Sequence, residues 1–276
     1  MRSVYRKKKT GNKIFLQKKV AIWLESLPKI IIFVWSYAYA CGVCINLLSN
    51  TYLTKNNKEM VILVLNCGSS SIKYQVLDVV ESSHTLLAKG LVERIGLAEG
   101  DLTHKPQGKD KFELHCPIPD HTTGIRLVLD ALTHEEHGVI KSLDELKAAG
   151  HRVAHGGEFF TDSCLVDDDV KAKIESLYSI APLHNPANLE GILSMEKVLP
   201  GIKQVAVFDT SFHHTIPAIN YLYAVPYEYY EKYRVRKYGF HGTSHKFVAR
   251  VGAEMFGLDF ENSKIVTCHI GNGASV

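Results

Sequence analysis

The residues best suited to phosphate chemistry lie in a short polar turn between two apolar runs. The run 61–65 ends at this turn, residues 68–71, and a second strand-like run continues through Asp78. Gly68 permits close approach of the backbone, and serine hydroxyl and amide groups can donate to phosphate oxygens. Asn66 and Lys73 flank the turn, where they could meet the charge of a metal ion or a phosphate. The alternative is a hairpin with an ordinary polar turn.

A second turn of the same kind lies roughly 200 residues further on. The predicted strand 264–270 ends in His269-Ile270 and is followed by Gly271-Asn272-Gly273. This turn is chemically parallel to the first. The chain stops at Val276, and we expect it to stop before this second hairpin closes.

Three further residues with chemical potential lie between the two turns. Arg152 precedes a Gly-Gly pair and can present a planar fork to a carboxylate or a phosphate. Asp209 follows the apolar run 204–208, at the strand end where α/β proteins place catalytic acids. His241 stands at the entrance of a predicted helix and could face a cleft. A surface arginine, a turn-capping aspartate and a structural histidine are the respective alternatives.

The surrounding pattern predicts the elements that position these residues. Runs 61–65, 72–78 and 86–95 favour an antiparallel meander, whereas residues 96–120 are expected to be rich in loops. Amphipathic spacing predicts helices over 122–132, 167–179 and 242–256. Asn185 before Pro186 is typical of a helix N-cap, and this helix should run towards Val198. We assigned Asn185 no chemistry, because capping explains it.

Charge and cysteine content exclude several classes of protein. The net charge is +3, yet residues 1–59 carry +9, so residues 60–276 carry −6. An acidic body without an aromatic and basic stripe argues against nucleic-acid binding. Cys41 and Cys44 have metal or redox spacing but no partner pair or nearby histidine. The other four cysteines are scattered, which indicates reduced thiols rather than a disulfide framework.

Six motifs of residues 60–276 together resemble the acetate kinase family, within the acetate and sugar kinase/Hsc70/actin superfamily. They are LVLNCGSSSIKY, HRVAHGGE, PLHNPANL, VFDTSFH, YGFHGTSH and HIGNGASV. The resemblance implies an α/β, ribonuclease-H-like duplicated fold with substrates in the cleft between domains. The first domain is expected at 60–205, and the second begins at 206 and is truncated. Residues 1–59 have no counterpart, and the family's second half is missing.

The resemblance also implies roles for individual residues. Asp209 and His241 match the catalytic pair, and Asn66 matches a magnesium-associated asparagine. Arg152 resembles the arginine that holds the carboxylate substrate, with Ala154, Leu183 and Phe240 around its methyl end. The implied phosphate contacts are Ser69, Ser71 and Lys73 in the first turn, and His269, Gly271, Asn272 and Gly273 in the second. The family usually has valine at position 154, and alanine there leaves room for a longer substrate.

The implied reaction is reversible transfer of the γ-phosphoryl group of ATP to acetate, which gives acetyl phosphate and ADP with Mg²⁺ as cofactor. A carboxylate is already nucleophilic at neutral pH, so alignment and charge neutralisation should dominate. Asp209 would then order metal, water or arginine. We expect this 276-residue chain to be inactive alone and the complete protein to be a homodimer. A propionate or butyrate kinase is the close alternative.

The apolar segment 30–49 raises a question of location. It carries no charge and is long enough to cross a bilayer as a helix. The basic flank before it would place everything after residue 50 outside, away from ATP. We therefore expect Met60 to be the natural first residue of a cytoplasmic protein, with the start assigned too far upstream. A genuine anchor, in a membrane-tethered binding protein without catalysis, is the alternative.

Overall fold

The computed structural model describes residues 20–23, 31–35, 59–80, 83–271 and 273–276. By their contacts, the residues group into two compact units. The larger unit is residues 40–240, and the smaller unit combines residues 1–39 with 241–276.

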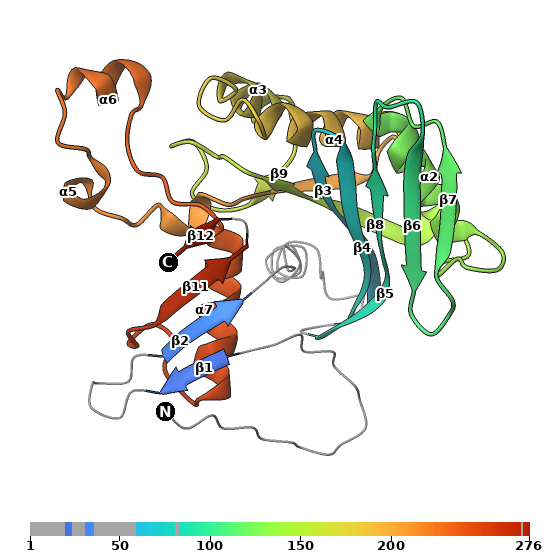
Figure 1. Ribbon diagram of the computed structural model, residues 1–276, viewed down its shortest axis with the longest axis horizontal. Coiled ribbons are helices and arrows are strands. Elements are labelled where there is room, and N and C mark those ends of the chain that lie inside the picture. The colour runs from blue at the N-terminus through green and yellow to red at the C-terminus, as the bar shows by residue number, and fades with distance from the viewer. Residues whose placement is uncertain (1–19, 24–30, 36–58, 81–82, 272) are drawn as a thin grey trace. The chain divides into compact units, whose positions relative to one another are not determined.

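The larger unit contains an eight-stranded mixed sheet in the order β7-β6-β5-β4-β3-β8-β10-β9 (Figure 1). The first five strands in sequence form an antiparallel meander, which confirms the predicted hairpin around the first glycine-rich turn. β8 then pairs parallel with β3, and β10 pairs parallel with β8. The strands are β3 (Glu59–Gly68), β4 (Ser71–Val80), β5 (Ser83–Glu93), β6 (Gly100–Pro106), β7 (Phe112–Cys116), β8 (Leu146–Val153), β9 (Cys164–Leu165) and β10 (Lys203–Phe208).

Helices cover one face of this sheet. α2 (His121–Thr133), α3 (Asp168–Ser176) and α4 (Asn185–Val198) pack there. In β3, the odd-numbered Leu63 and Leu65 join the core beneath the helices, and the even-numbered Ile62 and Val64 pack on the opposite face. Because side chains alternate along a strand, Asn66 also falls on the face opposite to the helices.

The loop-rich character expected for residues 96–120 was wrong, because β6 and β7 lie there. The inward positions of β6 are Gly100, Leu102, His104 and Pro106, so only one of them is strongly apolar. His104 is fully buried and is satisfied by the hydroxyl of Tyr74, 2.6 Å away, and by the carbonyl of His137. An alternation built from glycine, histidine and proline gives no hydrophobic signal.

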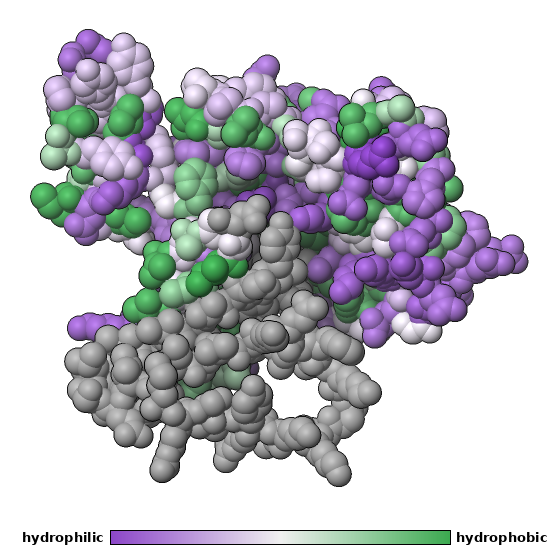
Figure 2. Space-filling model, in the orientation of Figure 1, coloured by the Kyte–Doolittle hydropathy of each residue, from purple (hydrophilic) through white to green (hydrophobic). Residues whose placement is uncertain are grey.

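An arm, residues 211–238, leaves the larger unit after β10. It contains η2 (Ser211–His213), α5 (Ala218–Tyr221) and α6 (Glu228–Tyr233). Several of its large apolar side chains are exposed, including Ile219 at 86% and Tyr233 at 63%. Hydrophobic residues are visible on the surface of this part of the molecule (Figure 2). The arm belongs to the larger unit, which ends two residues later at Phe240.

The smaller unit has a four-stranded sheet in the order β1-β2-β11-β12 beside α7 (Gly242–Met255). Its strands are β1 (Val20–Trp23), β2 (Ile31–Trp35), β11 (Val266–Ile270) and β12 (Ala274–Ser275). The expectation that the second hairpin stays open was wrong. His269 pairs with Ser275 and Ile270 with Ala274, because a three-residue turn is enough to reverse the chain.

The apolar segment 30–49 is described only in β2, and the rest of it lies outside the described residues. Within the described ranges, no helix combines the length and apolar character needed to cross a membrane.

Candidate active site

Three neighbouring parallel strands bring the predicted Asn66, Arg152 and Asp209 together. β3, β8 and β10 run in the same direction, so their carboxyl ends meet at one edge of the sheet. Asn66 and Arg152 each follow the last register pair between β3 and β8, which joins Leu65 to His151. Asp209 directly follows β10.

The guanidinium of Arg152 is held by two oxygen-bearing side chains. Its Nε and Nη2 donate to Oδ2 of Asp209 at 3.0 and 2.6 Å, and its Nη1 donates to Oδ1 of Asn66 at 3.2 Å. The side chain of Asp209 is 3% exposed, so its charge requires a partner inside the fold. The Arg152 side chain is 26% exposed and reaches the surface. The Nε and Nη2 edge is therefore occupied, and the guanidinium has a fixed orientation.

Two neutral histidines flank Arg152. Burial lowers the pKa of both His151 and His155 to about 4. Nδ1 of His155 accepts from the backbone N–H of Gly157 at 2.9 Å, which places the ring proton on Nε2. Neither imidazole carries a charge at neutral pH, so the positive charge of the segment 151–155 is that of Arg152.

The first glycine-rich turn lies next to Asn66. Ser69 and Ser70 are exposed, and Lys73 is exposed and faces Asn66 across the hairpin register. The carbonyl of Gly68 accepts from Nε2 of His121 at 2.7 Å, and that of Cys67 accepts from Nδ2 of Asn188 at 2.7 Å. The turn is therefore anchored from beneath by α2 and α4.

The residues expected around a substrate methyl group are placed unevenly. Ala154 is 3% exposed, whereas Leu183 is 80% exposed. Phe240 is 44% exposed, and its ring lies 5.5 Å from that of His155, centroid to centroid. The structure thus places Phe240 beside the ring of His155, whereas Leu183 is exposed.

The smaller unit holds the remaining predicted residues. The rings of His241 and His269 stack with centroids 4.1 Å apart. Nδ1 of His241 lies 2.8 Å from the hydroxyl of Ser275, and Nδ1 of His269 lies 2.9 Å from that of Ser244. His241 has φ of 56°, a left-handed conformation that costs free energy outside glycine. It precedes the first turn of α7, whose free amide groups favour anions.

In the second turn, the N–H of Gly271 donates to the carbonyl of Gly273 at 2.8 Å. A methyl group at Gly271 or Gly273 would meet nothing within 4 Å, so the turn is open to an approaching group. Asn272 lies outside the described residues.

The residues that sequence reasoning missed are the buried polar groups of the covering helices. Asn185 was expected to be an N-cap, but His184 is the cap residue, and the Asn185 side chain binds the backbone of His155 instead. Asn188 and His121 were not singled out. Asn188 lies among the buried residues of α4, next to Leu189. A polar residue among the apolar positions of that helix was the signal that could have indicated its role.

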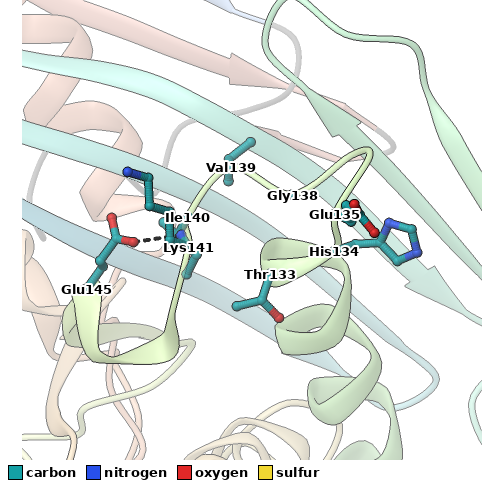
Figure 3. A pocket seen from close by; sticks show the side chains of 8 residues that line it. All are labelled: Thr133, His134, Glu135, Gly138, Val139, Ile140, Lys141 and Glu145. Atoms are coloured by element: carbon teal, nitrogen blue, oxygen red, sulfur yellow. Dashed lines mark hydrogen bonds between the residues drawn. The ribbon is translucent and has the colours of Figure 1, made fainter.

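No cluster of metal-ligating side chains marks another site in the described ranges. They contain no group of three or more His, Cys, Asp or Glu residues arranged around a metal ion. A surface hollow of about 490 Å³ lies between the end of α2 and η1 (Leu143–Glu145), and it includes none of the predicted site residues (Figure 3). It is lined by Thr133, His134, Glu135, Gly138, Val139, Ile140, Lys141 and Glu145.

Comparison with known proteins gives the class to which this fold and these residues belong. Residues 61–276 match the model of the acetokinase family, and the chain belongs to that family. It is 55% identical over 217 residues to the acetate kinase of Caldanaerobacter subterraneus subsp. tengcongensis, which covers 79% of this chain and 54% of that protein. Acetate kinase 2 of Clostridium perfringens is also 55% identical over 217 residues, with the same coverage.

Solved structures agree on the fold. The acetate kinase of Porphyromonas gingivalis superposes with a TM-score of 0.74 at 46% identity, over 78% of this chain and 53% of that one. A propionate kinase from Francisella tularensis gives 0.70 at 37% identity, over the same shares. The chain therefore has the mixed α/β, actin-like ATPase fold of these kinases, as expected. It spans about half the length of the curated relatives it matches.

Proposed function

We propose that this chain supplies the carboxylate-binding and first phosphate-binding residues of an acetate kinase, which transfers the γ-phosphoryl group of ATP reversibly to acetate. The observation that supports this most directly is the anchored guanidinium of Arg152. Asp209 and Asn66 bind it from one side, while part of the Arg152 side chain remains exposed. A small monocarboxylate can pair with such a guanidinium.

In this proposal, each residue contributes charge or alignment rather than proton removal. Arg152 neutralises and orients the acetate carboxylate, which is nucleophilic without a base. Asp209 holds Arg152 in place, in keeping with its two hydrogen bonds to the guanidinium. His241 would donate to the transferring phosphoryl group, where a preorganised donor is most effective.

The two glycine-rich turns would hold the phosphates of ATP. Ser69, Ser71 and Lys73 supply hydroxyl and ammonium donors in the first, and His269, Gly271, Asn272 and Gly273 form the second. The oxygens of Asn66 and Asp209 are of the hard type that Mg²⁺ prefers, and a single carboxylate suits a metal that arrives with nucleotide phosphates. Bound magnesium would neutralise phosphate charge. Such an enzyme would act in the cytoplasm, with ATP, and as a homodimer.

Propionate is the second candidate substrate. The side chain of Ala154 is smaller than the valine that the family usually carries at this position, and Leu183 is exposed. One of the similar solved structures is a propionate kinase.

Acetate binding by the 276-residue chain tests the proposal. Saturation-transfer NMR with acetate should give a signal that Arg152→Ala abolishes, because the charge-assisted pair is removed. Arg126→Ala, which removes an exposed arginine on α2, serves as the matched control and should leave the signal unchanged. Equal signals from the Arg152→Ala variant and the unmodified chain would refute the assigned role.

A further inference from the structure

The strands that carry Asn66 and Arg152 stop pairing with each other just where these residues begin. The ladder between β3 and β8 ends at Leu65 and His151. β3 nevertheless continues to Gly68 along β4, and β8 continues to Val153 along β10. The two strands therefore diverge at their carboxyl ends, and a gap in the backbone hydrogen bonding opens beneath the candidate site.

The side chain of Asn188 fills this gap. It comes from α4 and is 3% exposed. Its Oδ1 accepts from the N–H of Ala154 at 2.9 Å, and its Nδ2 donates to the carbonyl of Cys67 at 2.7 Å. One side-chain amide thus bonds to both strands, in the place where a ladder hydrogen bond would otherwise join them.

Only an amide satisfies both strands. Aspartate has nearly the same shape, but its carboxylate cannot donate and would turn an oxygen towards the carbonyl of Cys67. Alanine would leave a buried N–H and a buried C=O without partners, which is costly. Asn185 makes similar bonds to the next residue along the chain after Ala154. Its side chain accepts from the N–H of His155 and donates to the carbonyl of His155.

We propose that Asn188 is a positioning residue for Arg152 and Asn66. It sets the separation of β3 and β8 where they diverge, so that Nη1 of Arg152 meets Oδ1 of Asn66 at 3.2 Å. The consequence for acetate rests on the proposed function. The geometric part does not, because the bond between Arg152 and Asp209 can be observed without any ligand.

The experiment uses the full 276-residue chain labelled with ¹⁵N, in three variants. Asn188→Asp removes the donor at constant shape, and Asn188→Ala removes both groups. Ser194→Ala is the matched control, because Ser194 is also buried on α4 and bonds to Thr122 rather than to either strand. The readouts are the Nε–H resonance of Arg152, assigned by its loss in Arg152→Lys, and the dissociation constant for acetate.

We expect both Asn188 variants to shift or broaden the Arg152 resonance and to weaken acetate binding about tenfold or more, since misplacement of an aligned group is costly. Ser194→Ala should lower stability but leave the resonance in place. A resonance unmoved in both Asn188 variants would overturn the proposal. If the unmodified chain binds no acetate while the resonance still moves, the proposed function fails and the positioning role stands.

One measurement needs no variant. The amide of Ala154 pairs with a side chain rather than with a neighbouring strand, so its hydrogen exchange reports on Asn188 directly. We expect strong protection. Exchange as fast as that of exposed loop amides would overturn the proposal even if neither variant folds.

Discussion

The contact between Asp209 and Arg152 favours one of the roles that the sequence allowed for Asp209. A turn cap, a catalytic base and an ordering group are all compatible with an aspartate after a buried strand. In the structure, its Oδ2 accepts twice from Arg152, and the backbone N–H of Asp209 donates to the carbonyl of Val153. A carboxylate engaged in this way orients a cation.

The first prediction concerns the pH dependence of stability. The pKa of His151 and that of His155 are lowered from 6.5 to about 4 by burial, so the unfolded chain binds more protons between these values. Stability should therefore fall as pH drops through this window, by roughly 2 kcal/mol per histidine between pH 7 and pH 5. Urea unfolding at a series of pH values measures it.

A control separates this effect from general acid destabilisation. His151→Gln should remove one histidine's share of the slope, whereas His214→Gln, at an exposed position, should not change it. A slope that is the same in all three proteins would contradict the assignment.

The second prediction concerns the size of the substrate. Ala154→Val should fill the space beside the carboxylate site and lower the affinity for propionate relative to acetate. One methylene is worth about 0.8 kcal/mol, or about fourfold. Ligand-observed NMR titration of both acids against both proteins gives the ratio. An unchanged ratio would show that Ala154 does not limit substrate length.

At the scale of elements, the position of the arm depends on one carboxylate. Oε1 of Glu158 accepts from Tyr230 and from Arg236, both at 2.8 Å, and Oε2 lies 3.4 Å from Arg234. The guanidinium of Arg236 in turn covers the ring of Tyr221 at 3.5 Å from its centroid. Glu158 follows the Gly-Gly pair after Arg152, so the loop of the candidate site and the arm are joined there.

The third prediction is that Glu158→Gln loosens the arm. The variant keeps the size of the side chain but loses its charge, and chymotrypsin should then cut within residues 211–238 several times faster. The hydrogen bond from Tyr230 to Glu158 is the main cause that raises the pKa of this tyrosine to about 12, so that pKa should also fall. Glu228→Gln, within α6, is the control. Equal cleavage rates would contradict the role.

Sequence patterns predicted elements wherever the buried positions were apolar. The hairpin of β3 and β4, the strand before Asp209 and helix α7 follow from periodicity alone. β6 did not, because its inward positions are glycine, histidine and proline. The sequence predicted the site residues Asn66, Arg152 and Asp209. It did not predict the side chains from the covering helices that hold their strands in place. Asn188 bonds to a carbonyl 121 residues earlier in the chain, and a local pattern does not carry that information.

At the scale of the whole molecule, the two units differ in how much core they contain. The larger unit has three clusters of buried residues beneath and above its sheet. Among the described residues of the smaller unit, the one cluster consists of buried Val248 with partly buried Phe247 and Leu258. Counted over the described residues, the apolar area removed from water is therefore much smaller in that unit, and we expect its stability to be lower.

The fourth prediction follows from this difference. Native-state hydrogen exchange should show the amides of α7 and β11 opening at low urea concentration, well before those of β3 and β8. Mass spectrometry of peptides from each segment would measure both transitions. A single transition shared by all four elements would mean that the units unfold as one.

β3 pairs on one edge with β4, which is close in sequence, and on the other edge with β8, which is far away in sequence. This arrangement also determines the order in which the strands of the sheet can pair during folding. Its antiparallel neighbour β4 follows at once in sequence, and residues 59–116 form a contiguous meander. Its parallel neighbour β8 begins only at Leu146, and such non-local pairing closes slowly. While the chain is being synthesised, the other edge of β3 therefore stays unpaired until that segment leaves the ribosome. An apolar strand edge exposed for that interval is where a chaperone, or a second nascent copy, would first attach.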